Sequence, residues 1–197
     1  MPRSEHVNQQ IRDERRRQIL HVAAEIFARK GLGETRISDI AEASGISQGL
    51  IYRYFPSKEE LFKALIETST SATATGLEQA LKLAGTPWEK LTWLTSYIWQ
   101  GICEHPAHFQ VVLHALISEA VPPDIRTLAL ERIQATLAIF GQLIREGQQA
   151  GQVVTGDPDE LALLYGALIQ GLAASAWYMG YRAERLSVEL ILRLLKP

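Results

Sequence analysis

Side chains that can bind base edges and phosphates are concentrated between residues 35 and 58, where the chain reads TRISDIAEASGISQGLIYRYFPSK. Glutamine can pair bidentately with adenine N6 and N7, and arginine with guanine O6 and N7. Hydroxyl groups, an ammonium group and free N–H groups at helix starts suit phosphate oxygens. The candidates for base contact are Gln48, Arg36 and Arg53, and those for phosphate contact are Thr35, Ser47, Tyr52, Tyr54 and Lys58, with Gly49 allowing the backbone to approach closely.

Two short helices joined by a glycine turn must position these groups. Ile37 and Ile40 are spaced to share one face of the first helix, and Ile51 and Phe55 one face of the second. Gly45 lies in the short connection, as a helix-turn-helix requires. The pattern therefore predicts that each helix buries one face, and that the second helix enters the major groove with its N-terminal half toward base edges.

The segment from residue 15 to residue 66 resembles the DNA-binding domain of the tetracycline-repressor-type (TetR) transcriptional regulators. That family's pattern has a glycine after the first helix, an I-A pair, the run G-[IV]-S-x-G-x-[LI]-Y-x-[HY]-F and a lysine three residues later. Two positions depart from it: Arg36 stands where a second Thr or Ser is common, and Tyr54 where His is common. The matching residues are Gly31, Ile40-Ala41, Gly45-Ile46-Ser47-Gln48-Gly49, Ile51-Tyr52, Tyr54-Phe55 and Lys58.

Composition favours an all-α protein. In the 197 residues Leu, Ala, Gln and Glu are abundant, and no alternating strand pattern recurs. The resemblance implies an N-terminal helix-turn-helix DNA-binding domain, residues 1–57 with 1–10 disordered, joined to a larger helical ligand-binding and dimerisation domain, residues 58–197. Beyond the motif, helices are predicted to begin near residues 11, 58, 87, 106, 124, 158 and 184.

Charge is distributed unevenly along the chain. Residues 1–58 carry ten Lys/Arg and seven Asp/Glu, a net +3, whereas residues 59–197 carry a net −5. A modest local positive charge suits a protein that touches a limited number of phosphates. Arg15, Arg16 and Arg17 either add phosphate contacts or form a solvated helix face.

Other features bear on the compartment. Cys103 is the single cysteine, which excludes an intrachain disulfide and fits a reducing cytoplasm, and residues 1–18 are too polar for a signal peptide. The 21 residues from Leu161 to Tyr181 carry no charged side chain and could cross a bilayer or be buried against a partner helix. The acidic start at residues 157–160 follows soluble helix-capping rules and favours the second interpretation. We expect a bacterial, cytoplasmic, nucleoid-associated protein with no membrane partner.

The resemblance also implies a pocket for an apolar or aromatic ligand, although aromatic residues at helical spacing equally suit a core. The candidate pocket residues are Trp93, Tyr97, Cys103, Phe109, His114, Tyr165, Gln170 and Trp177. A homodimer interface is expected on the last two helices, where small residues permit close approach. Its candidates are Gly166, Gly171, Ala174, Leu186, Leu190 and Leu194.

Metal binding and catalysis find little support. The spacing C-x-H-x2-H-x5-H from Cys103 to His114 matches no familiar zinc signature, and no catalytic motif is present. We therefore expect no metal, no cofactor and no enzymatic activity. The predicted function is that of a transcriptional repressor, which binds a palindromic operator as a homodimer and is released by a small inducer. The alternative is a constitutive or architectural DNA-binding regulator without an inducer.

Overall fold

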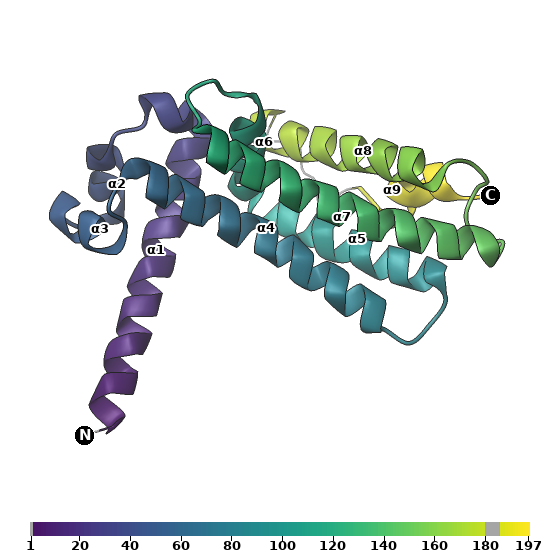
Figure 1. The fold of residues 1–197 in the computed structure, drawn as a ribbon, viewed down its shortest axis with the longest axis horizontal. Helices are drawn as coiled ribbons and strands as arrows, with labels where there is room; N and C mark the ends of the chain where they lie inside the picture. The colour runs from purple at the N-terminus through teal and green to yellow at the C-terminus, as the bar shows by residue number, and fades with distance from the viewer. Residues whose placement is uncertain (1, 180–185) are drawn as a thin grey trace.

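The computed structural model describes residues 2–179 and 186–197, with the side chains of residues 2–6 left aside. Helices account for nearly all of the described chain and no strand occurs in it, which confirms the all-α prediction (Figure 1). The elements are α1 (Pro2–Glu34), α2 (Ile37–Ser44), α3 (Gln48–Tyr54), α4 (Lys58–Lys82), α5 (Pro87–Glu104), α6 (Pro106–Ile117), α7 (Pro123–Gln149), α8 (Pro158–Met179), α9 (Val188–Ile191) and the 3-10 helix η2 (Leu192–Leu195).

Side-chain caps define several of the helix starts. Ser47 Oγ accepts from Leu50 N at 3.2 Å before α3, and Ser57 Oγ accepts from Glu60 N at 3.0 Å before α4. At α5, Thr86 and Glu89 form a reciprocal capping box, which lowers the pKa of the Glu89 carboxyl through hydrogen bonds from Thr86. These caps satisfy N–H groups that a helix start leaves without intrahelical partners, and so fix where each helix begins.

Two hydrophobic cores lie along the molecule, and α4 runs through both. The first core joins α1, α2, α3 and the start of α4 to α6 and the N-terminal part of α7. The second joins the end of α4 to α5, α8, α9 and the C-terminal half of α7. Leu61 and Leu65 of α4 belong to the first core, and Leu77 and Ala80 to the second. α4 therefore connects the two cores.

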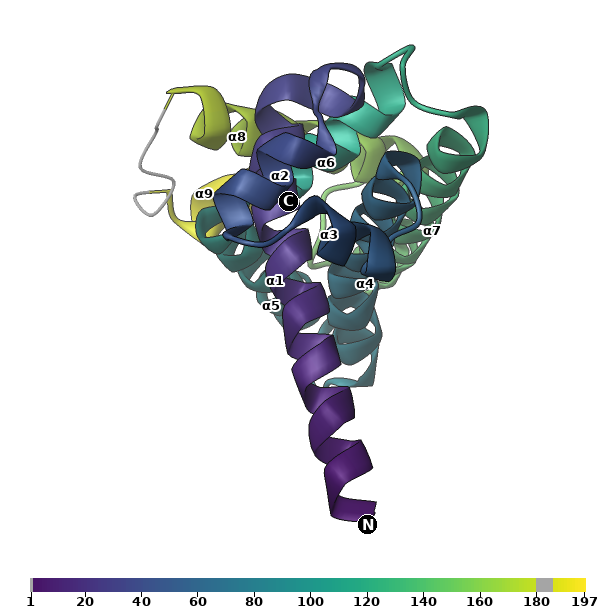
Figure 2. The same cartoon turned by 90° about the vertical axis from the view of Figure 1, so that its left-hand side faces the viewer.

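The N-terminal half of α1 projects away from the helical body (Figure 2). Disorder was expected over residues 1–10, but residues 2–10 continue the helix, while residue 1 is outside the described chain. Local side-chain pairs support this helix: Gln9 donates to Asp13 at 2.9 Å, and Arg17 pairs with Glu14.

Gly31 interrupts α1 where the chain turns toward α2. Its φ of 71° and ψ of 174° belong to a region that side chains with a Cβ avoid. Thr35 donates from Oγ1 to the Gly31 carbonyl oxygen at 2.6 Å and closes this turn. The glycine expected after the first helix is therefore required by the backbone.

The C-terminal segment differs from the helix predicted to begin near residue 184. Residues 184 and 185 lie outside the described chain, and the rest forms only α9 and η2. Ser187 caps α9, and Val154 N donates to the Leu195 carbonyl oxygen at 2.9 Å. This bond ties the chain end to the loop before α8, and the 3-10 turn replaces further α-helix.

Candidate nucleic-acid interface and ligand cavity

α2 and α3 form a helix-turn-helix at one end of the molecule (Figures 1 and 2). Gly45 ends α2 in the left-handed conformation, with φ 65° and ψ 30°, and Ile46 N donates to the Ala41 carbonyl oxygen at 3.0 Å. Ile40 and Ile51 are fully buried in the first core. Burial of these two faces determines which side chains of α3 remain free.

The outer face of α3 carries most of the residues predicted to contact DNA. Gln48, Gly49 and Arg53 are exposed, and Tyr52 is 48% exposed. A Cβ at Gly49 would meet no atom within 4 Å, so the backbone there borders open space. Arg36 is exposed at the start of α2. The outer face of α3 therefore presents an amide from Gln48, a guanidinium from Arg53, a phenol from Tyr52 and an accessible backbone at Gly49.

Two of the predicted phosphate contacts are directed into the protein instead. Thr35 is only 1% exposed, and its hydroxyl proton is used by Gly31. Lys58 donates from Nζ to the carbonyl oxygens of Gly33, at 3.3 Å, and Thr35, at 3.0 Å. Both side chains fasten the loop between α1 and α2. Periodicity could not reveal this role, because the loop conformation depends on Gly31.

Tyr54 and Ser47 each make contacts within the protein and remain at least partly exposed. Tyr54 is half-buried and packs against the first core. Ser47 is exposed and accepts from Leu50 N as the cap of α3, which leaves its hydroxyl proton available. Ser47 can still offer a hydroxyl hydrogen at the surface, and Tyr54 remains partly exposed.

An ion pair holds α2 against α1. Lys30 Nζ lies 2.8 Å from Asp39 Oδ2, and Arg36 N donates to the same oxygen at 3.2 Å. The hydrogen bond from Lys30, followed by that from the Arg36 backbone, holds the pKa of the Asp39 carboxyl below its usual range. The carboxylate therefore serves as a fixed anchor at the N-terminus of α2.

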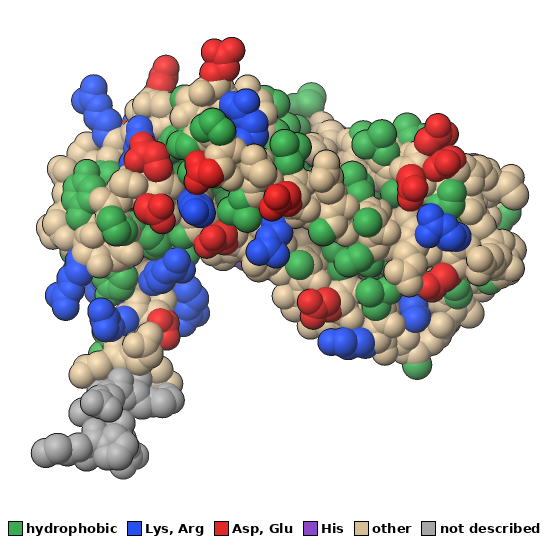
Figure 3. All heavy atoms as spheres, in the orientation of Figure 1, with side chains coloured by type: hydrophobic (Ala, Val, Ile, Leu, Met, Phe, Trp, Pro, Cys, Tyr) green, Lys and Arg blue, Asp and Glu red, His purple; other side chains and the backbone are tan. Residues whose placement is uncertain are grey.

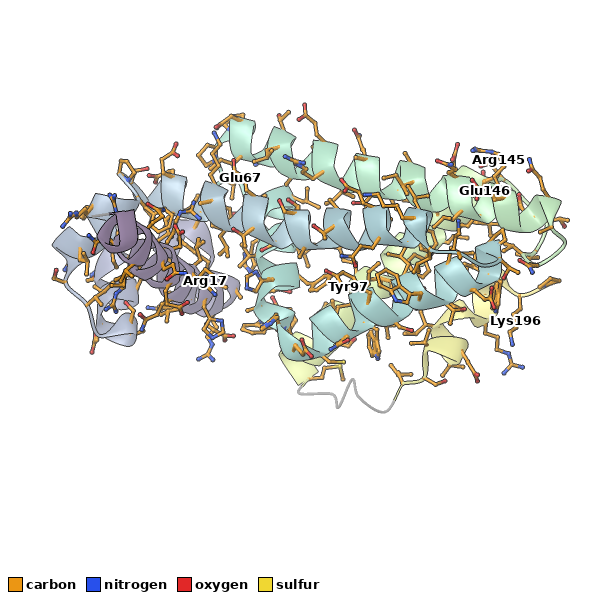
Figure 4. The ribbon with its side chains drawn as sticks, turned by 90° about the horizontal axis from the view of Figure 1, so that it is seen from below. Arg17, Glu67, Tyr97, Arg145, Glu146 and Lys196 are labelled. Atoms are coloured by element: carbon orange, nitrogen blue, oxygen red, sulfur yellow. The ribbon has the colours of Figure 1, made fainter. Side chains whose placement is uncertain are left out.

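Arginines of α1 add positive charge beside α3. Figure 3 shows basic side chains gathered where the projecting part of α1 stands next to the helix-turn-helix. The Arg16 guanidinium carbon lies 5.0 Å from the Phe55 ring centroid, and Arg15 donates to Gln18 at 2.8 Å. Arg17, labelled in Figure 4, pairs with Glu14. Arg16 and Arg17 are exposed, and Arg15 is half-buried.

A cavity of about 330 Å³ lies among α4, α6, α7 and α8, with Ile98 contributed by α5. Three predicted pocket residues line it: Phe109, Tyr165 and Gln170. Its volume falls at the lower end of the range for small-molecule sites, roughly 300–1,000 Å³. The wall residues are Ser69, Thr70, Thr73, Ile98, His108, Phe109, Gln110, Val112, Leu113, Arg132, Ile133, Thr136, Leu137, Phe140, Leu163, Tyr165, Gly166, Ala167, Ile169, Gln170, Ala173 and Ala174.

The other five predicted pocket residues do not line this cavity. Trp93 stacks on Tyr97, with ring centroids 5.4 Å apart, and Tyr97 reaches from α5 to α4, donating to the Ala72 carbonyl oxygen at 3.2 Å (Figure 4). Cys103 and Trp177 are half-buried beside the cores, and His114 lies against Gly31. The aromatic residues among these five therefore take part in helix packing. α5 contributes only Ile98 to the cavity wall.

Sequence reasoning missed the polar residues that α4 contributes. Residues 68–75 read T-S-T-S-A-T-A-T, and Ser69, Thr70 and Thr73 line the cavity. Ser69 and Thr70 donate to the carbonyl oxygens of Leu65 and Ile66, each at 2.8 Å. Such bonds let hydroxyls lie against an apolar space without an unpaired proton. A run of small hydroxyl residues in a helix interior was the available signal.

Two titratable groups in the wall are neutral over a wide pH range. Burial raises the pKa of the Tyr165 phenol, which donates to Thr95 Oγ1 at 3.0 Å and stacks on Phe140 at 3.9 Å between centroids. Burial, followed by the nearby His105 and His21, lowers the pKa of His108 to about 4. Among the described residues no cluster of His, Cys, Asp and Glu could hold a metal ion.

α8 presents an apolar face to solvent. Leu163 and Leu164 are about 60% exposed, Gly171 is exposed, and no described atom lies within 4 Å of a Cβ built on it. The helix is long and apolar enough to cross a membrane by length and composition alone, and 22% of its most apolar window is buried. Of the other predicted interface residues, Leu190 is exposed, and Gly166, Ala174, Leu186 and Leu194 are half-buried.

Comparison with known proteins adds to this geometry. Residues 19–65 match the family "Bacterial regulatory proteins, tetR family". An HTH-type transcriptional regulator of Bacillus subtilis, YfiR, is 25% identical over 89% of this chain and 86% of its own length. The HTH-type transcriptional repressor KstR2 of Mycolicibacterium smegmatis is 37% identical over 51% of this chain, which spans about half of that protein.

Among solved structures, a transcriptional regulator from Saccharomonospora viridis in complex with choline is 28% identical. It has a TM-score of 0.70 and covers 92% of this chain and 93% of its own. Residues 19–65, the segment that matches the tetR family, begin within α1 and end within α4 and so contain the whole helix-turn-helix described above. The chain belongs to the TetR family of transcriptional regulators.

Proposed function

We propose that this protein is a ligand-responsive repressor, which binds a palindromic operator as a homodimer and leaves it when a small molecule occupies the cavity. One observation carries the proposal: α4 connects the helix-turn-helix to the cavity wall. Its first turns share a core with α2 and α3, and Ser69, Thr70 and Thr73 line the cavity. A ligand that moves α4 would therefore move the exposed face of α3.

In this proposal residues 1–57 supply the DNA contacts, and residues 58–197 supply the ligand site and the interface. Gln48, Arg36 and Arg53 read base edges or bind phosphate, and Tyr52 and Ser47 bind phosphate. Gly49 admits a close phosphate or base. Thr35 and Lys58 act indirectly by holding the loop before α2.

The second subunit is expected on the exposed face of α8. Leu163, Leu164 and Gly171 face solvent in the single chain, and a contiguous apolar surface of this kind is usually covered in a stable protein. Packing of α8 and α9 against their copies would form a four-helix arrangement about a two-fold axis. Two recognition helices would then be presented about 34–36 Å apart or at a related spacing.

Release needs only a modest energetic coupling between cavity and DNA. A coupling of about 1–3 kcal/mol changes operator affinity by about 5- to 150-fold. The relative KstR2 is named a repressor, and the relative from S. viridis was solved with choline. The first supports a repressor, and the second supports a small-molecule site. Its expected place is the bacterial cytoplasm, on the nucleoid.

The first experiment is selection of the purified protein against random duplex DNA, with sequencing of the bound pool. Enrichment of an inverted repeat supports the dimeric, sequence-specific regulator and supplies the operator for a search for inducers. An enriched operator from which no member of a broad ligand panel releases the protein would favour the constitutive regulator. A folded, dimeric protein that enriches no sequence would contradict the proposal.

A further inference from the structure

The cavity has an uneven charge distribution, which bears on the class of ligand that the proposed function requires. Its described wall contains no Asp or Glu, and its only permanently charged side chain is Arg132 of α7. Much of the buried wall is apolar, as at Phe140, Ile169 and Ala173, and its buried polar groups are uncharged. A cation embedded in such a wall would therefore find no counter-charge, whereas an anion would find one.

Arg132 marks the mouth of the cavity. It is exposed in the single chain, as are the wall residues Leu163 and Ala167 of α8, of which Leu163 also belongs to the face proposed for the second subunit. Arg132 forms no ion pair within the described part of the chain, unlike Arg145 on the same helix, which lies 3.7 Å from Asp159. A guanidinium with free donors beside an apolar opening is suited to a planar or tetrahedral oxyanion.

The inner polar groups offer hydrogen bonds without charge. Ser69 directs its hydroxyl proton to Leu65 O at 2.8 Å, so the 2.8 Å contact with His108 is a bond from Nδ1–H to Ser69 Oγ. The neutral imidazole then keeps Nε2 as an acceptor. Gln110 is 3% exposed and donates from Nε2 to Tyr178 at 2.6 Å, which leaves its amide oxygen as another acceptor. These groups favour a neutral inner end of the ligand.

We infer that the cavity binds a compact amphipathic anion, with its apolar body between α4, α6 and α8 and its anionic group on Arg132. This assignment rests on the proposed function, because it names the ligand of the same cavity. The relative from S. viridis was solved with choline, a cation. Because the described wall has no carboxylate, we expect this cavity to bind such a cation weakly.

The test uses three probes with matched eight-carbon chains that differ in charge: octanoate, 1-octanol and octyltrimethylammonium. Each is titrated calorimetrically into the full-length protein at neutral pH. We expect octanoate to bind at least about tenfold more tightly than octanol, and the cation to bind most weakly. Arg132→Gln should lower octanoate affinity about tenfold and leave octanol affinity unchanged. Arg145→Gln is the matched control on α7 and should change neither.

A second variant shows whether the eight-carbon chain of the probe occupies the cavity. Thr136→Phe fills the space one turn from Arg132 but keeps the guanidinium, and should abolish binding of octanoate and octanol alike. Equal affinity for octanoate and octanol, tighter binding of the cation, or no octanoate binding up to about 1 mM would overturn the inference. Octanoate binding that survives Thr136→Phe in a folded protein would overturn it as well, by placing the anion outside the cavity.

These experiments distinguish a failure of the ligand assignment from a failure of the proposed function. Calorimetry without DNA reports the ligand class, and operator binding with and without octanoate reports regulation. A protein that binds octanoate in the expected order, yet stays on its operator, keeps the ligand assignment and contradicts the inducer role for this probe. A protein that releases its operator with octanol as readily as with octanoate contradicts the anion assignment and keeps the repressor.

Discussion

Lys58 Nζ lies 3.0 Å from the Thr35 carbonyl oxygen, so the first residue of α4 is bound to the loop that leads into α2. The same ammonium donates to Gly33 O at 3.3 Å. Two carbonyl groups of the segment that joins α1 to α2 are thereby held to the helix that reaches the cavity. The lysine that was expected to contact phosphate is thus hydrogen-bonded to the backbone before α2 in the free protein.

Lys58→Met should therefore weaken operator binding through the fold and leave its salt dependence unchanged. Loss of charge-assisted bonds to two carbonyl groups is expected to lower the free energy of unfolding by about 1–2 kcal/mol. Chemical denaturation measures that change. The slope of log affinity against log salt concentration should match the wild type, because no phosphate contact is lost.

Arg53→Ala is the matched change on the exposed face of α3. It should leave the free energy of unfolding within about 0.5 kcal/mol of wild type and reduce the salt slope by about one phosphate contact. If Lys58→Met lowered the salt slope as Arg53→Ala does, the inward orientation of Lys58 would not hold on DNA.

Gln48→Ala should relax sequence preference at one base pair of each half-site. Gln48 is the first residue of α3 and is exposed, and a bidentate contact to adenine is worth about 1–3 kcal/mol of discrimination. The measurement is affinity for operators with every base at each position, before and after the substitution. Gln79→Ala, on the exposed surface of α4, is the control and should leave the profile unchanged. A uniform loss across all operators would assign Gln48 to the backbone of the DNA instead.

Sequence patterns located the helix-turn-helix because its geometry is local. Gly45, Ser47 and the buried pair Ile40 and Ile51 determine the turn, the cap and the inner face within fifteen residues. The direction of the Lys58 and Thr35 side chains was not predictable in this way. It depends on the unusual backbone at Gly31, which only the folded chain displays.

The cavity was harder to predict, because its wall is assembled from helices far apart in the sequence. Helical periodicity shows that Trp93 and Tyr97 share a face of α5, but not that this face lies against α4 instead of a ligand space. Tyr165 was predicted correctly as a wall residue, yet its hydroxyl is used by Thr95, seventy residues earlier. Long-range pairings of this kind leave no spacing signal.

Stability should decrease in mild acid because of His108. Its pKa is lowered to about 4 in the folded protein, against about 6.5 when unfolded, so the unfolded chain binds more protons between these values. The free energy of unfolding must then fall as pH drops through this window, by at most about 2 kcal/mol between pH 7.5 and pH 5. Urea unfolding at the two pH values measures the difference.

His108→Asn is the control for this pH dependence. Asparagine can keep a hydrogen bond with Ser69 but does not titrate, so its unfolding free energy should change less with pH. His21 and His105, which face His108, remain in both proteins. An equal loss of stability in wild type and variant would show that another group titrates in this window.

Gly171→Glu should convert the protein to a monomer without unfolding it. A Cβ at Gly171 meets no described atom within 4 Å, so the subunit has room for the side chain, and a glycine in a helix interior costs about 1 kcal/mol relative to better helix formers. Two carboxylates brought together at a two-fold interface would repel each other and lose hydration. Sedimentation velocity measures the mass, and circular dichroism confirms that the helices persist. Ser96→Glu on the exposed face of α5 is the control and should remain dimeric. A folded Gly171→Glu dimer would place the interface away from this face of α8, whereas a folded monomer that binds single half-sites weakly would connect the apolar face of α8 to operator recognition.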